Sequence, residues 1–127
     1  MPNNKLALEW LSFAERNLET AKLLNHHNHY TDVIAIDIQQ SVEKTFKAVF
    51  AFYGKKIPRT HSLEILYNFV LTKDIIRDID KKKLLLISDY YISERYPGPR
   101  YFSPDKDEIN DSIEFAEIIL NQIKDHF

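Results

Sequence analysis

Residues 31–54 read TDVIAIDIQQSVEKTFKAVFAFYG, and this stretch decides the fold. Its apolar residues return every three or four positions, a spacing that places them on one side of an α-helix. We therefore predict a helix from Thr31 to about Tyr53. Gly54 follows, and glycine readily adopts the left-handed conformation that closes a helix. The residues expected to face the core are Ala35, Ile38, Val42, Phe46 and Val49.

The same spacing recurs on both sides of this segment. Residues 4–26 predict a first helix, whose apolar side consists of Ala7, Leu11, Ala14, Leu18 and Ala21. A shorter helix is expected to begin after Thr60, as its N-cap, and to end near Leu71. A fourth is expected from Ile75 to Arg95, because Pro97 disfavours helical geometry at the residue before it.

The last helix is predicted to open at Ser103-Pro104-Asp105, with a capping hydroxyl, a proline at the first helical position and an acid at the positive end of the helix dipole. Its apolar side is Ile109, Ile113, Ala116, Leu120, Ile123 and Phe127. No segment shows the alternation of a strand. We therefore predict one all-α domain over residues 1–127, an up-and-down four-helix bundle with one additional short helix.

Composition limits the function. The chain has 127 residues, 44% of them hydrophobic and 28% charged, and it has no cysteine, which excludes disulfides and thiol chemistry. The longest apolar run, Ala48–Tyr53, is too short to span a bilayer, and the first residues lack the pattern of a signal peptide. We expect a cytoplasmic protein that does not associate with membranes.

Charge is unevenly distributed. The formal net charge of −2 argues against a protein that coats nucleic acid. Residues 44–59 nevertheless carry five basic side chains and no acidic one. This segment either meets a phosphate group or a short RNA segment, or is simply solvated surface.

Several chemistries are disfavoured. A phosphate-binding glycine loop needs more than the two glycines present. Asp78 and Asp80 resemble a magnesium-binding pair, but no sheet supports them. His26, His27 and His29 lack the helical spacing that directs two rings at one metal ion, so we interpret them as exposed turn histidines. We expect no metal site.

Polar residues of the second helix are candidates for a site. Gln40, Glu43 and Lys47 fall on one side of the helix, and Glu43 and Lys47 are spaced as an i, i+4 ion pair. They either stabilise the helix or border a cleft. His61 stands at the start of the third helix, where it either relays a proton or forms a hydrogen bond across the bundle.

The stretch SERYPGPRYF, Ser93–Phe102, places two arginines beside aromatic rings. It is either a rigid helix terminator, whose arginines bond to the last carbonyl groups, or a site that handles phosphate.

Taken together, these segments resemble the HEPN family (higher eukaryotes and prokaryotes nucleotide-binding domain). The resemblance rests on a glutamine pair, a Val-Glu-Lys cluster and a Lys-Ala in the second helix, followed by a glycine, a proline, a Thr-His-Ser-Leu segment and an Arg-Tyr-Pro. Here these are Gln39-Gln40, Val42-Glu43-Lys44, Lys47-Ala48, Gly54, Pro58, Thr60-His61-Ser62-Leu63 and Arg95-Tyr96-Pro97.

The resemblance implies a helical bundle that forms a homodimer and puts its arginines into a shared cleft. Many HEPN proteins are metal-independent ribonucleases with a histidine shortly after the arginine, and some pair as toxins with a minimal nucleotidyltransferase. This chain has no histidine after Arg95 but has Tyr101, which matches a variant whose tyrosine the partner can adenylylate.

On this resemblance, Arg95 and Arg100 would clamp a phosphate, and Tyr96 or Tyr101 would stack on a base. Arg95 would stabilise charge while Tyr101 or His61 relays a proton, and Gln40, Glu43 and Lys47 would border the ligand. The ligand would be a nucleotide or RNA, with no required cofactor. The alternatives are a non-catalytic dimeric module that docks a nucleotidyltransferase and a purely structural helical adaptor.

Overall fold

The computed structural model describes residues 2–93 and 103–127, and five helices make up most of this part. They are α1 (Asn4–His26), α2 (Thr31–Phe52), α3 (Leu63–Leu71), α4 (Lys81–Ser93) and α5 (Lys106–His126). The described residues contain no strand. The prediction of an all-α bundle is therefore confirmed.

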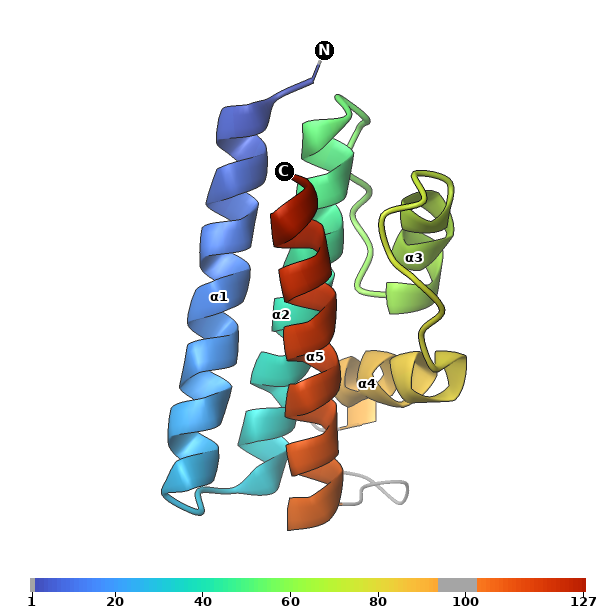
Figure 1. Cartoon of the computed structure of the whole chain (residues 1–127). Coiled ribbons are helices and arrows are strands. Elements are labelled where there is room, and N and C mark those ends of the chain that lie inside the picture. The colour runs from blue at the N-terminus through green and yellow to red at the C-terminus, as the bar shows by residue number, and fades with distance from the viewer. Residues whose placement is uncertain (1, 94–102) are drawn as a thin grey trace.

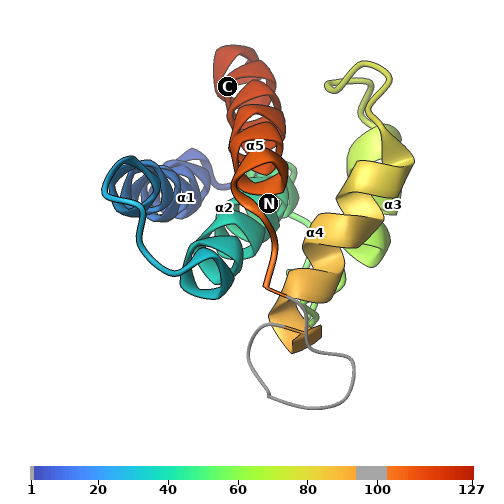
Figure 2. The ribbon, with the colours of Figure 1, turned by 90° about the horizontal axis from the view of Figure 1, so that it is seen from below.

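Helix α2 is the central element. It packs against each of the other four helices. Helices α1, α2 and α5 run alongside one another, whereas α3 and α4 lie on the other flank of α2 (Figures 1 and 2). Helix α4 lies across the long helices rather than along them (Figure 1). This arrangement brings the start of α3 and the body of α4 against the middle of α2.

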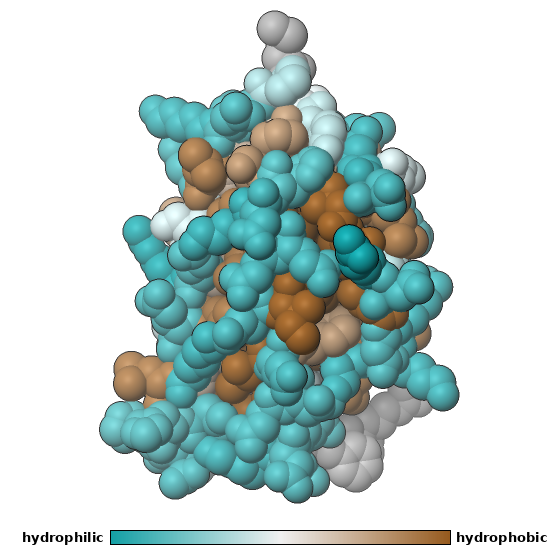
Figure 3. All heavy atoms as spheres, viewed as in Figure 1, coloured by the Kyte–Doolittle hydropathy of each residue, from teal (hydrophilic) through white to brown (hydrophobic). Residues whose placement is uncertain are grey.

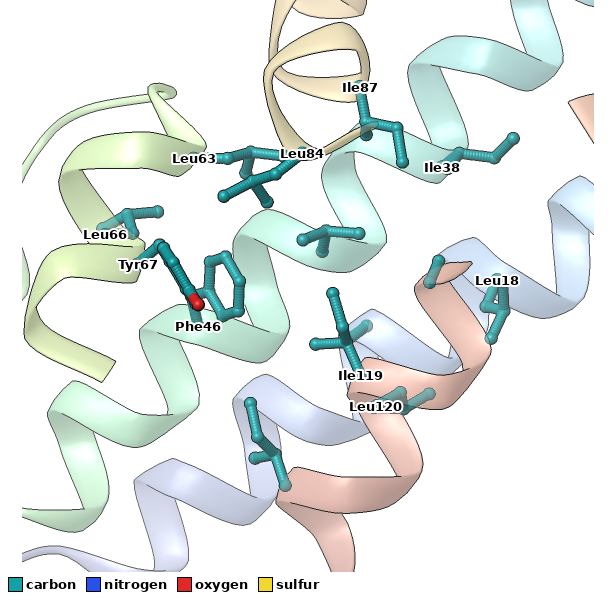
Figure 4. Packing of buried hydrophobic residues seen from close by; sticks show 14 of the residues in the cluster. Leu18, Ile38, Phe46, Leu63, Leu66, Tyr67, Leu84, Ile87, Ile119 and Leu120 are labelled. Carbon is teal, nitrogen blue, oxygen red and sulfur yellow. The ribbon is translucent and has the colours of Figure 1, made fainter. Parts of the chain in front are cut away.

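The core forms where the predicted apolar sides meet. Every residue expected to face inward from α1 and α2 is buried. Phe46 of α2 points toward Tyr67 of α3, with ring centroids 6.0 Å apart (Figure 4). On α5, Ile109 to Ile123 of the predicted stripe are buried, and Phe127 stacks on Phe52 at 4.4 Å. The 3.6-residue period of the sequence therefore specifies the core.

Gly54 closes α2 as predicted. Its φ of 67° lies in the left-handed region, which glycine occupies without steric cost. The amide of Gly54 donates to the Ala51 carbonyl, and that of Lys55 donates to the Phe50 carbonyl at 2.8 Å. These two bonds form a Schellman motif, which satisfies the last carbonyl groups of the helix. The chain then leaves α2 toward His61.

Two predicted helix starts are wrong by a few residues. Helix α3 is capped by Ser62, not Thr60, because the Ser62 side chain accepts from the Ile65 amide. Helix α5 is capped by Asp105, whose side chain accepts from the Glu108 amide at 2.8 Å. The prediction of Ser103 as the cap is therefore wrong. In both cases an oxygen closer to the free amides of the first turn takes the capping position.

The predicted fourth helix starts too early. Residues 75–80 are not helical, and α4 begins at Lys81. Asp74 has a φ of 54°, which turns the chain after α3. Asp80 then caps α4, because its Oδ1 accepts from the amides of Lys82 and Lys83. The predicted end at Arg95 lies outside the described residues.

The face of the molecule seen in Figure 3 is mainly polar. Hydrophilic side chains predominate there, and hydrophobic residues show mainly along the middle. Within residues 2–93 and 103–127, no helix has the length and apolar character needed to cross a membrane.

The central position of α2 predicts a large stability cost for truncating its core side chain. Phe46→Ala should lower the free energy of unfolding by about 3–5 kcal/mol, because it leaves a cavity at a fully buried position. Phe13→Ala is the matched control, since Phe13 is 47% exposed, and it should cost about 1 kcal/mol or less. Urea unfolding followed by circular dichroism measures both. Equal losses in the two variants would contradict this packing.

Candidate functional site

The candidate site is built on three polar residues one helical turn apart on α2. Gln39, Glu43 and Lys47 are spaced i, i+4, i+8 and therefore share one side of the helix. All three are buried: Gln39 is fully enclosed, and Glu43 and Lys47 are each 7% exposed. Buried charges are stable only when they are paired and hydrogen-bonded.

The Glu43 carboxylate is surrounded by donors. Lys47 Nζ donates to Oε2 at 3.0 Å, and Gln39 Nε2 donates to Oε1 at 3.0 Å. His61 Nδ1 lies 2.9 Å from the same Oε1. Gln39 Nε2 also donates to the backbone carbonyl of His61 at 3.1 Å. The carboxylate thus joins α2 to the segment that precedes α3.

These contacts determine the charge state of Glu43. Burial raises the pKa of this carboxyl, but hydrogen bonds from Gln39, His61 and Lys47, together with the positive charge of Lys47, outweigh burial. The net effect is a pKa below its ordinary value. Glu43 is therefore ionised at neutral pH and can act only as an acceptor.

His61 is held on a second side by an aromatic ring. Its imidazole stacks on Tyr91 of α4, with ring centroids 3.8 Å apart and an interplanar angle of 14°. The adjacent backbone is also tied to α4, because the Leu63 amide donates to Ser88 Oγ at 3.0 Å. The orientation of His61 is therefore set by both α2 and α4.

A surface hollow opens beside His61. It has a volume of about 340 Å³ and is lined by His61, Ser62, Ser88, Asp89 and Tyr91. About half of the His61 side chain is exposed, whereas Glu43 behind it is enclosed. The arrangement presents an imidazole to the hollow, with a buried carboxylate on the inner nitrogen of the ring. This chemistry suits proton transfer or hydrogen bonding to a bound group.

The chain is similar to known proteins over most of its length. Residues 7–126 match the family model described as HEPN domain. The chain belongs to the HEPN domain family. A relative from Methanocaldococcus jannaschii, named "Putative toxin MJ1304", is 33% identical, and the alignment covers 97% of this chain and 89% of the relative. The family resemblance inferred from the second helix is therefore confirmed.

Two solved structures share the fold of this HEPN protein. TT1696 from Thermus thermophilus superposes with a TM-score of 0.73 at 23% identity, covering 95% of this chain and 98% of the other. ST0689, described as an archaeal HEPN homologue, gives a TM-score of 0.71 at 23% identity, covering 99% of this chain and 98% of the other. Both superpositions show that the fold is shared.

The structure brings together three of the residues predicted for the site. Glu43, Lys47 and His61 form one hydrogen-bonded group. Gln40 is half-buried on α2, and it is Gln39, not Gln40, that bonds to Glu43. Four further predicted site residues lie outside the described part of the chain: Arg95, Tyr96, Arg100 and Tyr101.

Sequence reasoning missed Gln39, Tyr91 and the hydroxyl of Ser88. The i, i+4 spacing to Glu43 was a signal for Gln39. No local signal identifies Tyr91 or Ser88, because their contacts with residues 61–63 depend on how α4 crosses the bundle.

The described residues hold no cluster of three potential ligands for a metal ion. Asp78 and Asp80 are exposed, and Asp80 caps α4. His26 at the end of α1 is exposed, as are His27 and His29 in the turn that follows.

The lowered pKa of Glu43 predicts a specific acid response. The ionised Glu43 carboxylate contributes its full stabilisation above the ordinary carboxyl pKa of 4.5. This stabilisation is lost as the pH falls through the lowered pKa of Glu43. Glu43→Gln should therefore destabilise the protein at neutral pH by about 3–5 kcal/mol, because Lys47 stays buried without its counter-ion. The Glu43→Gln variant should also lose less stability than the wild type when the pH is lowered.

Thermal unfolding from neutral to acidic pH measures this response. Glu114→Gln is the control, because Glu114 is an exposed carboxylate on α5. If the glutamine variant at position 43 loses stability on acidification as steeply as the wild type, the assignment of the acid response to Glu43 is incorrect.

Proposed function

We propose that this HEPN protein is the toxin of a toxin–antitoxin pair, that it binds RNA, and that it cleaves RNA without a metal ion. The observation that carries the proposal is the Glu43–His61 pair, which presents a half-exposed imidazole to the hollow. The name of the relative from Methanocaldococcus jannaschii supports the toxin role. The partner would be a minimal nucleotidyltransferase, and the active form a homodimer.

The proposed chemistry is a transesterification within RNA. The ribose 2′-oxygen attacks the adjacent phosphorus, the bond from phosphorus to the 5′-oxygen breaks, and the products are a 2′,3′-cyclic phosphate and a 5′-hydroxyl. His61 accepts the 2′-hydroxyl proton, with Tyr101 as a second proton relay. Arg95 and Arg100 clamp the phosphate and stabilise the charge that develops on it. Tyr96 stacks on a neighbouring base.

The site residues of α2 have a supporting part in this scheme. Lys47 balances the charge of Glu43, and Glu43 holds the imidazole. Neither side chain is exposed enough to contact a nucleotide directly, since each is about 9% exposed. Their proposed role as a border of the ligand site therefore operates through His61.

A second candidate is a non-catalytic module that docks a nucleotidyltransferase. It is favoured by the sequence after Arg95, which reads YPGPRYF and contains no histidine. A tyrosine has an ordinary pKa near 10 and is a weak base at neutral pH. On this view Arg95 and Tyr101 bind a nucleotide or the partner without cleaving RNA.

Cleavage of end-labelled transfer RNA in a chelating buffer tests the first proposal. The wild type should cleave, and Arg95→Ala should lower the rate constant by roughly 10²–10³-fold through loss of charge stabilisation. Arg77→Ala is the matched control, because Arg77 is an exposed arginine between α3 and α4 and should cleave normally. A folded wild type that cleaves no RNA would contradict the ribonuclease proposal and favour the docking module.

A further inference from the structure

We infer that Glu43 is a positioning residue that holds neutral His61 in one tautomer, with the proton on Nδ1 and the lone pair of Nε2 directed to the hollow. The inference deepens the proposed function and rests on it for the catalytic use of His61. The tautomer itself is a property of the protein alone. It follows from three sets of contacts in the described residues.

The first set consists of the hydrogen bonds that the Glu43 carboxylate accepts. Oε2 accepts from Lys47, and Oε1 accepts from Gln39. The orientation of the Gln39 amide is fixed, because its nitrogen faces two acceptors, Glu43 Oε1 and the His61 carbonyl. A carboxylate that receives these donors is an acceptor toward every neighbour. The 2.9 Å contact with His61 Nδ1 therefore requires the proton on Nδ1.

The second set fixes the ring plane. Tyr91 covers one side of the imidazole at 3.8 Å and so fixes the plane of the ring, whereas the contact of Nδ1 with Glu43 selects which nitrogen faces inward. The Gln39 bond to the His61 carbonyl holds the backbone of the same residue. Position and rotation of the imidazole are thus controlled by α2 and α4 together.

The third set concerns Nε2. No described residue hydrogen-bonds to this nitrogen, and the ring lines the hollow with about half of its side chain exposed. Asp89 of α4 lines the same hollow and is the one described carboxylate there that could compete for the imidazole proton. Glu43 has the advantage because it is enclosed and already in contact with the ring.

The consequence for cleavage is a base that is ready before RNA binds. Nε2 accepts the 2′-hydroxyl proton, and His61 becomes an imidazolium with a proton on each nitrogen. Glu43 stabilises this charge through Nδ1 without itself taking the proton. The departing 5′-oxygen takes a proton from solvent, and His61 later returns its proton to solvent, so protons balance without a metal ion or cofactor.

Long-range proton–nitrogen NMR spectra of the uniformly ¹⁵N-labelled full chain test the tautomer directly. At a pH where His61 is neutral, the wild type should show a protonated Nδ1 and an unprotonated Nε2. Glu43→Gln should give a mixture of tautomers, since a glutamine amide can donate as well as accept. Asp37→Asn is the control on the same helix, because the Asp37 carboxylate accepts from Asn17 of α1, and it should leave the spectrum unchanged. His61→Asn assigns the signals.

RNA cleavage separates this inference from the proposed function. Glu43→Gln should lower the cleavage rate constant by roughly 10–100-fold, as expected for a residue that orients a catalytic histidine, with little change in RNA affinity. A wild-type spectrum with the proton on Nε2 overturns the inference, even if RNA is cleaved. The expected tautomer in a protein that cleaves no RNA would uphold the positioning role and reject the ribonuclease proposal.

Should Glu43→Gln fail to fold, the wild-type spectrum still decides the tautomer, and Gln39→Ala provides the second variant. It removes one donor to Glu43 and the bond to the His61 backbone, but it keeps the carboxylate. The Nδ1 tautomer should persist in it while the cleavage rate falls. A spectrum of Gln39→Ala with the proton mainly on Nε2 would show that Glu43 does not fix the tautomer.

Discussion

The Glu43 carboxylate is ionised and enclosed, and the contacts that satisfy it tie α2 to the segment before α3. An ionised carboxylate in the interior requires hydrogen-bond donors, since desolvation is otherwise prohibitive. Gln39 and Lys47 supply them from α2 itself, and His61 supplies one from the segment before α3. These contacts hold the segment before α3 against the middle of α2, and Tyr91 of α4 stacks on the imidazole from another side. The His61 imidazole is left half-exposed at the hollow.

The fold follows from the sequence wherever hydrophobic periodicity decides it. Helices α1 and α2 begin and end almost where the spacing of their apolar residues predicts, and Gly54 closes α2 through its left-handed conformation. The errors lie at helix starts that have several capping residues close together. Thr60 and Ser62, like Ser103 and Asp105, are alternative caps only two residues apart, and the choice depends on the path of the connecting chain.

The site was predictable only in part, for a different physical reason. Glu43 and Lys47 are local partners, so their pairing follows from helical spacing. The contacts of His61 with Glu43 and Tyr91 join residues 18 and 30 positions apart, and they depend on how α3 and α4 pack on α2. Gln39, not Gln40, bonds to Glu43, from the i, i+4 position. Arg95, Arg100 and the two tyrosines beside them stay predictions from sequence and family.

In the proposed mechanism, Glu43 and His61 act as one unit in RNA cleavage. A double-mutant cycle can measure this coupling from the cleavage rate constants of Glu43→Gln, His61→Asn and the double variant. Residues that act as a unit give strongly non-additive effects. The double variant should therefore cleave no more slowly than His61→Asn alone. If the two single effects multiply in the double variant, Glu43 and His61 act independently and the account is wrong.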